Sequence, residues 1–146
     1  MASRTKKLVG VYFIDIDSFK HINDSIGHLG GDLLLQQIGQ RMKKSVREYD
    51  VVARFGGDEF LIMIPQADDL ASIEKVAIKV LENLKQPIVI RGQNLVISIS
   101  IGIAVYPVDG DDPDELLKSA DIAMYVSKGI ARNRYAFCSE ERTNLP

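Results

Sequence analysis

The sequence is poor in the residues that build disulfides and zinc sites. Its 146 residues include a single cysteine, Cys138, which cannot form a disulfide within the chain and which favours a reducing compartment. Neither of its two histidines lies at metal-ligand spacing from the other, so we expect no zinc site. The formal net charge of -2 gives no sign of broad electrostatic binding to DNA or RNA. We therefore expect no disulfide scaffold and no nucleic-acid partner.

Long hydrophobic runs are also missing. No stretch is long enough to cross a bilayer. The apolar run Leu8–Ile14 follows Arg4, Lys6 and Lys7, as in a signal peptide, but it is short and no small-residue cleavage site follows it. The chain has no repeat or internal linker, and its length suits one domain. We therefore predict a single cytoplasmic domain, residues 1–146, without membrane contact.

The hydrophobic pattern predicts strands mixed with helices. The run at 8–14 is typical of a central strand buried on both faces. Two hairpins are expected, one with a primed Gly56-Gly57 turn and one around Gly92-Gln93-Asn94 that ends in a half-buried strand at 95–105. Helices are predicted at 18–26, 32–46, 70–84 and 115–130, with a last strand at 135–138. The combination indicates an α+β fold, with helices flanking a mainly antiparallel central sheet.

Polar residues around the first helix have structural interpretations. Asp17 is expected to cap the N-terminus of that helix rather than to bind a metal. The glycine-rich segment 27–31 is expected to end the helix in a loop, in which His28 would tie down the backbone. Taken alone, Asp32 would cap the next helix.

Three carboxylates could meet at one end of the predicted sheet. Asp15 ends the first strand, and Asp58 and Glu59 directly follow the Gly56-Gly57 turn. If the hairpin pairs beside the first strand, the three side chains converge on one point. Such a cluster is costly without a cation and suits one or two Mg²⁺ ions. Alone, the hairpin tip would be a solvated turn.

Other side chains near these carboxylates could hold a nucleotide. Lys20 lies one turn into the first helix, where backbone N–H groups favour anions. Lys128 and Arg132 share a face of the last helix and could clamp a triphosphate, although alone they would be a solvated face. Asn23 and Asp32 could read a guanine edge, since the carboxylate accepts from N1–H and from the 2-amino group.

Five motifs follow one another along the chain. They are Asp15–Asp24 (DIDSFKHIND), Gly27–Asp32 (GHLGGD), Gly56–Phe60 (GGDEF), Ser98–Ala104 (SISIGIA) and Ala120–Tyr125 (ADIAMY). Together they make the chain resemble the GGDEF family, the diguanylate cyclases of bacteria, over about Leu8–Phe137. A further segment, Tyr106–Gly110, is similar to the subgroup in which an EAL phosphodiesterase domain follows.

The resemblance implies a fold, a reaction and a set of site residues. The fold is the palm-like sheet of class III nucleotidyl cyclases. In the reaction, two GTP molecules, each held by one domain of a homodimer, become cyclic di-GMP and two pyrophosphates. Asp58 and Glu59 would be the catalytic residues, and together with Asp15 and the Ile16 carbonyl they would hold Mg²⁺ or Mn²⁺. The substrate-binding residues would be Lys20, Asn23, His28, Asp32, Lys128 and Arg132.

The resemblance also implies a second, inhibitory site for the product. Arg47 and Asp50 stand where the family has its Arg-x-x-Asp motif, and we expect them at a surface turn before the hairpin. Otherwise they would be a solvated ion pair.

Two departures and two alternatives accompany the resemblance. The family's usual Asp-x-Leu-Thr-Gly-Leu-x-Asn-Arg lead-in is missing before the first strand, so we expect a slow and mostly monomeric domain. Ala131 stands where the family usually has glycine. The alternatives are a weakly catalytic module that binds GTP or cyclic di-GMP and regulates a neighbour, and, more distantly, a polymerase-like nucleotidyl transferase.

Overall fold

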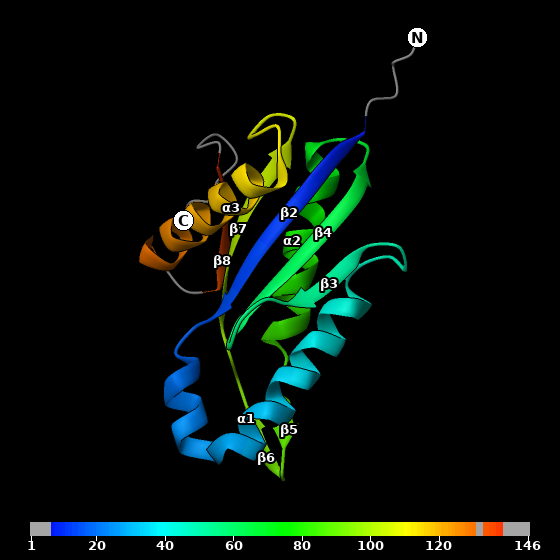
Figure 1. The fold of residues 1–146 in the computed structure, drawn as a ribbon. Helices are drawn as coiled ribbons and strands as arrows, with labels where there is room; N and C mark the ends of the chain where they lie inside the picture. The colour runs from blue at the N-terminus through cyan, green and yellow to red at the C-terminus, as the bar shows by residue number, and fades with distance from the viewer. Residues whose placement is uncertain (1–6, 131–132, 139–146) are drawn as a thin grey trace.

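The computed structural model describes residues 7–130 and 133–138 and contains a central five-stranded sheet (Figure 1). The strands run in the order β3-β4-β2-β7-β8, and only β7 and β8 pair in parallel. The predicted α+β fold with a mainly antiparallel sheet is therefore confirmed. The strands of this sheet are β2 (Leu8–Ile16), β3 (Val51–Arg54), β4 (Glu59–Ala67), β7 (Ile99–Tyr106) and β8 (Arg134–Phe137).

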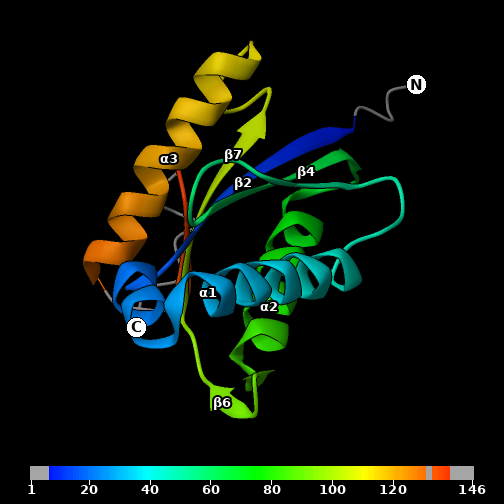
Figure 2. The same ribbon diagram turned by 60° about the horizontal axis from the view of Figure 1, so that its bottom comes forward.

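Helices cover both faces of the sheet. The helices α1 (Phe19–Lys44) and α2 (Leu70–Lys85) lie on one face, and α3 (Pro113–Ile130) lies on the other (Figures 1 and 2). The larger part of the core lies on the α1 and α2 side, and a smaller cluster under α3 includes Phe13 and Met124. In the part of the chain that the structure describes, no helix is both long and apolar enough to cross a membrane.

The first helix is kinked rather than interrupted by a loop. Only Gly27 leaves the helical conformation, with φ 83° and ψ 167°, and α1 continues through the predicted loop at 28–31. Two helical segments therefore meet at Gly27, but the loop predicted between them is wrong, and Asp32 is an exposed residue inside α1 instead of a cap. One residue in the left-handed region is enough to redirect a helix, and glycine adopts it at little cost.

The second predicted hairpin divides between two sheets. β5 (Ile88–Ile90) pairs with β6 (Gln93–Leu95) in a separate two-stranded sheet, and β7 begins only at Ile99 and pairs with β2. The single strand predicted at 95–105 is therefore wrong. The turn needs two consecutive residues with positive φ, Arg91 at 52° and Gly92 at 80°, so it starts earlier than predicted.

The strand β7 is buried on both faces, not on one as predicted. Every residue from Ile99 to Val105 is buried, because α3 packs directly on this strand. A Cβ atom added to Gly102 would lie 2.0 Å from the Ala120 carbonyl oxygen. The close approach of α3 therefore requires glycine at this position.

Asp17 does not cap α1. The N-cap residue is Ser18, at φ 58°, and its side chain makes no capping hydrogen bond. The Asp17 carboxylate turns instead toward β7 and accepts hydrogen bonds from the hydroxyl groups of Ser98 and Ser100. The prediction failed because it considered only local partners, whereas the serines lie more than eighty residues away in sequence.

Candidate active site

The hairpin formed by β3 and β4 pairs beside the end of β2. Asp15 faces Glu59 in the antiparallel register, and the Ile16 N–H donates to the Asp58 carbonyl oxygen at 3.2 Å. Figure 1 shows the hairpin tip at the end of β2 from which the chain leaves for α1. The hairpin therefore pairs beside the first strand, which is the arrangement that the predicted meeting of the carboxylates requires.

The hairpin turn differs from the predicted one. Four residues, 55–58, connect the strands, and the N–H groups of Phe55 and Gly56 donate to the Glu59 carbonyl oxygen at 2.8 and 3.4 Å. Neither Gly56 nor Gly57 has a positive φ, so the predicted primed turn is wrong. A four-residue connection needs no left-handed pair. Glycine is favoured at position 56 for a steric reason, because an added Cβ would lie 3.0 Å from Glu59 Oε1.

The carboxylates concentrate negative charge opposite one ammonium group. Asp15 is buried, and Lys128 donates a hydrogen bond to its Oδ2. Burial raises the pKa of Asp15, and the neighbouring Asp58 carboxyl raises it further, while Lys128 opposes both effects. Burial also raises the pKa of Glu59, and the charges of Asp15, Asp58 and Asp121 add to this shift. The site therefore favours a cation.

The donor set is a carboxylate pair rather than a complete metal cage. Among residues 7–130 and 133–138, no three His, Cys, Asp or Glu side chains form a group that could hold a metal ion, so the predicted convergence of three carboxylates is not observed. The charge of Asp58 is close enough to Asp15 to raise the pKa of its carboxyl group. Mg²⁺ commonly binds one or two carboxylates and completes its shell with water and substrate phosphates. The oxygen donors present fit such an ion.

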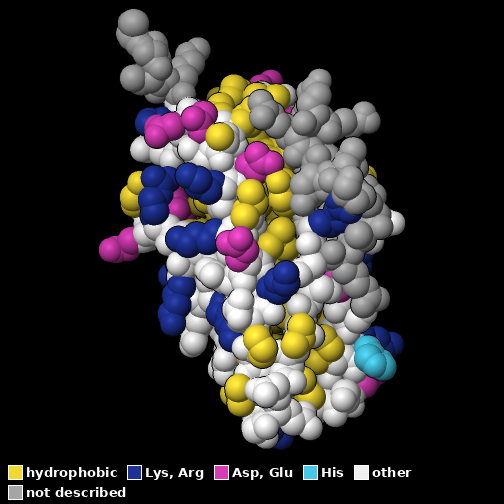
Figure 3. All heavy atoms as spheres, turned by 180° about the vertical axis from the view of Figure 1, so that it is seen from behind, with side chains coloured by type: hydrophobic (Ala, Val, Ile, Leu, Met, Phe, Trp, Pro, Cys, Tyr) yellow, Lys and Arg dark blue, Asp and Glu magenta, His cyan; other side chains and the backbone are white. Residues whose placement is uncertain are grey.

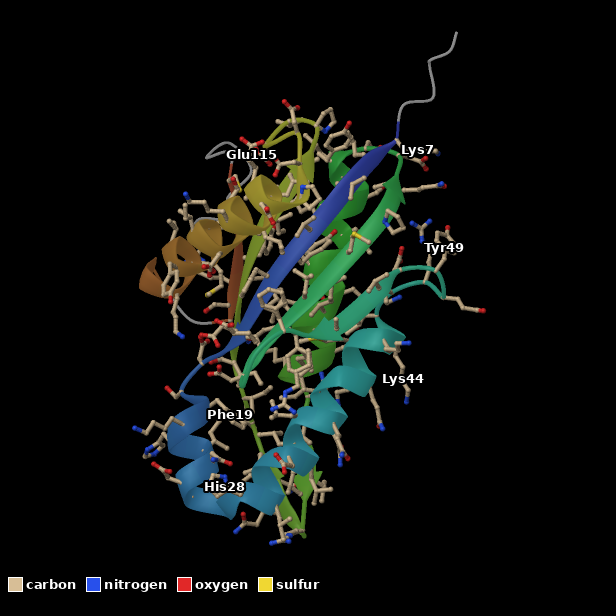
Figure 4. All side chains as sticks on the ribbon, in the orientation of Figure 1. Lys7, Phe19, His28, Lys44, Tyr49 and Glu115 are labelled. Atoms are coloured by element: carbon tan, nitrogen blue, oxygen red, sulfur yellow. The ribbon has the colours of Figure 1, made fainter. Side chains whose placement is uncertain are left out.

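The kink in α1 folds the predicted guanine-binding residues toward each other. Asn23 Nδ2 lies 3.4 Å from His28 Nδ1 across the kink. A Cβ on Gly31, the residue before Asp32, would lie 2.0 Å from Asn23 Oδ1. Figure 4 shows Phe19 at the start of α1, next to the end of the sheet, and His28 farther from the sheet. Asn23 therefore lies directly against the turn that carries Asp32.

Of the other two predicted phosphate-binding residues, Lys20 and Arg132, the structure describes only Lys20. Lys20 is exposed on the first turn of α1, three residues after Asp17. Arg132 lies outside the described residues, so the proposed pair of Lys128 and Arg132 is represented by Lys128 alone.

The Arg47 and Asp50 pair is only half exposed. Arg47 is exposed, its guanidinium lies 4.8 Å from the Tyr49 ring centroid, and it donates to the Gln66 carbonyl oxygen at 2.9 Å. Asp50 is buried, and its Oδ2 accepts from the Arg47 backbone N–H at 2.8 Å. The expected surface pair is therefore wrong for Asp50. Its side chain points inward because the backbone N–H of Arg47 lies there as a donor.

A cavity adjoins this pair. It has a volume of about 270 Å³, and Arg47, Asp50 and two lysines of α2, Lys75 and Lys79, are among its lining residues. Figure 3 shows Lys and Arg side chains gathered on the back of the molecule, where α2 lies. Within the described residues, Asp50 Oδ1 is buried without a hydrogen-bond partner. The lysines were missed in the sequence because their helical spacing alone is typical of a solvated face.

Sequence reasoning also missed partners of the predicted site residues. Asp121 on α3 is close enough to raise the pKa of Glu59, and its position seven residues before Lys128 puts both on one helix face. Ser98 and Ser100 bind Asp17. Their i, i+2 spacing indicated a shared strand face but not what that face would contact.

Comparison with known proteins assigns the chain. A family model described as "Diguanylate cyclase, GGDEF domain" matches residues 1–134. The bifunctional diguanylate cyclase/cyclic di-GMP phosphodiesterase MucR of Pseudomonas aeruginosa is 43% identical over 136 residues, which are 93% of this chain and 20% of MucR. The chain therefore spans only a fifth of this relative.

Solved structures show the same fold over nearly the whole chain. An EAL/GGDEF domain protein from M. capsulatus is 48% identical, with a TM-score of 0.87 over 93% of this chain and 88% of that one. The GGDEF domain of YfiN (TpbB) from Pseudomonas aeruginosa is 37% identical, with a TM-score of 0.88 over 99% of this chain and 88% of that one. Sequence and fold agree, and the chain belongs to the GGDEF family of diguanylate cyclase domains.

Proposed function

We propose that this domain condenses two GTP molecules into cyclic di-GMP and two pyrophosphates. The observation that carries the proposal is the pairing of the hairpin with β2, which brings Asp58 and Glu59 beside the end of β2, where Asp15 is bonded to Lys128. Acidic oxygens beside a lysine suit a nucleotide triphosphate with its cation. Membership of the GGDEF family supports the same reaction.

The carboxylates have the role of holding a divalent ion and moving a proton. Asp15, the Ile16 carbonyl, Asp58 and Glu59 would hold Mg²⁺ or Mn²⁺. When bound, this ion neutralises phosphate charge and acidifies the attacking 3′-hydroxyl. Asp58 accepts the proton of that hydroxyl, with Glu59 beside it. Burial and, after it, the charges of Asp15 and Asp58 raise the pKa of Glu59, and the positive charge of the ion relieves the repulsion among these carboxylates.

The cationic side chains bind the triphosphate. Lys20 faces it from the start of α1 and Lys128 from α3, and Arg132 contributes a third positive charge. Lys128 donates to Asp15 in the structure, and a three-donor ammonium group can bind a carboxylate and a phosphate oxygen together. Lys128 therefore links the ion-binding carboxylate to the phosphates.

The guanine base is read by residues on both sides of the kink in α1. Asp32 accepts from guanine N1–H and the 2-amino group, and Asn23 and His28 contribute the remaining polar contacts. Adenine presents an acceptor at N1, which would face the Asp32 carboxylate as acceptor against acceptor. The pocket therefore prefers GTP to ATP.

Each domain binds one GTP, so the reaction requires a homodimer with the two sites facing each other. The product cyclic di-GMP inhibits by binding at Arg47 and Asp50. The adjoining cavity and the unpaired Asp50 oxygen support this second site. We place the domain in the cytoplasm, and the likeness to MucR makes an EAL domain a natural neighbour in a longer protein.

The second candidate is a regulatory module that binds GTP or cyclic di-GMP with little turnover. The observation in its favour is that Lys128 already bonds the Asp15 oxygen that a metal would need. Incubation of the protein with GTP and Mg²⁺, with chromatography of the products, separates the two. Cyclic di-GMP and pyrophosphate are expected, and binding of GTP without either product would favour the module.

A further inference from the structure

The chain between β2 and α1 is anchored to β7 by a buried carboxylate. Asp17 is only 4% exposed. Its Oδ1 accepts from Ser100 Oγ and its Oδ2 from Ser98 Oγ, both at 2.8 Å, and its backbone N–H donates to the Ser98 carbonyl oxygen at 3.0 Å. We call Asp17, Ser98 and Ser100 the Asp17–serine cluster. Three hydrogen bonds therefore fix one residue to Ser98, which directly precedes β7, and to Ser100 within that strand.

This anchor lies between the two parts of the candidate active site. On one side, the residue before Asp17 donates its N–H to the Asp58 carbonyl oxygen. On the other side, Ser18 takes the left-handed conformation, and α1 begins at Phe19. A serine in this conformation is held by its surroundings rather than by its own preference. The cluster supplies the fixed point from which the chain turns.

The chemistry of the cluster is more specific than strand pairing requires. A buried carboxylate needs hydrogen bonds to offset its lost hydration, and two hydroxyl donors provide them. Among the residues that the structure describes, Asp17 pairs with no cation, so its negative charge adds to the field at Lys128. The group is satisfied within the protein and has no lone oxygen directed at a ligand.

We infer that Asp17 is a positioning residue. Through Ser98 and Ser100 it sets the Ile16–Ser18 turn, and thereby the Ile16 carbonyl and the first turn of α1 relative to Asp58. This inference rests on the proposed function, because the metal and the triphosphate are what the positioned groups bind. Asp17 itself touches neither.

The experiment measures binding rather than turnover. Calorimetry with Mn²⁺ and a non-hydrolysable GTP analogue reports the metal and triphosphate end of the site, and guanosine reports the base-binding end alone. For Asp17→Ala we expect the Mn²⁺-dependent affinity for the analogue to fall by about 10- to 100-fold, the range for residues that orient metal ligands. The affinity for guanosine should not change.

Two further variants separate position from charge. In Asp17→Asn the amide oxygen accepts from one serine and the amide N–H donates to the other, since a hydroxyl can do either. Affinity should recover most of the way to that of the wild type. The matched control is Asp69→Ala, because Asp69 also accepts from a serine, Ser72 Oγ at 2.7 Å, but near the opposite end of β2. This control should leave both affinities unchanged.

Defined outcomes overturn the inference. Unchanged binding of the analogue in folded Asp17→Ala, or an equal loss for guanosine, would reduce the cluster to a stability element. A loss in Asp17→Asn as large as in Asp17→Ala would assign the effect to charge. If Asp17→Ala does not fold, Ser98→Ala and Ser100→Ala each remove one bond, and both should weaken the analogue more than guanosine.

Failure of the proposed function can be told apart from failure of this inference. Wild-type protein that binds the analogue but makes no product refutes the cyclase, while the binding comparison still decides the role of Asp17. If the wild type binds neither probe, amide hydrogen exchange decides. Ser100→Ala must then cost protection at the amides of residues 16 and 17, and unchanged protection refutes the positioning role.

Discussion

Asp17 and Asp50 are both buried carboxylates, but their oxygens are satisfied to different degrees. Asp17 has a serine hydroxyl on each oxygen. Asp50 accepts on Oδ2 from the Arg47 backbone, and its buried Oδ1 has no hydrogen-bond partner in the part of the chain that the structure describes. Both follow or precede a strand of the central sheet by one residue. Burial alone therefore does not define what a carboxylate does.

The difference separates a fixed support from a group that can still take a partner. A buried acceptor without a hydrogen bond costs about 1–3 kcal/mol, which a ligand donor can return on binding. Asp50 lines a cavity with Arg47 and two lysines, so a ligand can reach that region. The Asp17–serine cluster has no unpaired oxygen to offer. Its contribution is to the geometry of the neighbouring groups.

The largest effect is expected at Asp58, because we propose that this residue contacts the reacting atoms. The effects of the other variants can be compared with it. Asp58→Asn removes the proton acceptor and one charge of the carboxylate pair. We expect turnover to cyclic di-GMP to fall by about 10²–10³-fold with an unchanged unfolding temperature. Initial rates by chromatography test this. Near-normal turnover in the folded variant would remove Asp58 from the site.

A smaller effect is expected at Asn23, whose side chain packs directly against Gly31. A Cβ in Gly31→Ala would lie 2.0 Å from Asn23 Oδ1, so the amide must move away from the base. Losing one hydrogen bond to guanine lowers GTP affinity by about 1–3 kcal/mol, or roughly 5- to 150-fold. Gly129→Ala is the matched control, because nothing lies within 4 Å of its added Cβ. Equal GTP affinity in both variants would contradict the role of Asn23.

The next prediction tests the site at Arg47 and Asp50, where a carboxylate oxygen can still take a partner. Arg47→Ala removes a guanidinium that can contact a guanine edge through two hydrogen bonds. It also removes the 3.5 Å ion pair of Arg47 Nε with Asp50 Oδ2, while the Arg47 backbone N–H still donates to that oxygen. Cyclic di-GMP affinity by calorimetry should fall by about tenfold, near the lower end of 1–3 kcal/mol, and product inhibition should weaken. Lys85→Ala, a lysine at the far end of α2, serves as control. Unaltered affinity would leave Arg47 as surface charge.

The smallest expected effect is on the free energy of unfolding, and it is measured for Asp50 against Asp17. Asp50→Asn keeps an acceptor for the Arg47 N–H and removes a buried charge with one unpaired oxygen, so the free energy of unfolding should change by less than about 1 kcal/mol. Asp17→Ala loses two hydrogen bonds to a charged group and should lower it by about 3 kcal/mol. Urea denaturation measures both. A loss of more than about 2 kcal/mol in Asp50→Asn would show that Asp50 is as well satisfied as Asp17.

Several features of the fold could be predicted because they depend on near neighbours. The apolar run of β2, the amphipathic pattern of α2 and the mixture of hairpins with helices led to the observed α+β sheet. The pairing of Asp15 with the hairpin acids followed from where two strands end. Other predictions failed because the outcome needed distant partners. β7 is buried on both faces because α3 covers it, and its alternating pattern carries no record of that helix.

The sequence by itself determined the set of chemical groups: carboxylates after β2 and at the hairpin, lysine on α3, and amide and acid on α1. It determined them because the type of each residue and its place along the chain do not depend on how the chain folds. Only the tertiary structure decided how each group is used. Asp17 became a support and not a cap because β7 brought two hydroxyls to it. For Asp50, whose carboxylate is held locally by the backbone N–H of Arg47, the tertiary structure decided that it is buried and lines a cavity with two lysines of α2.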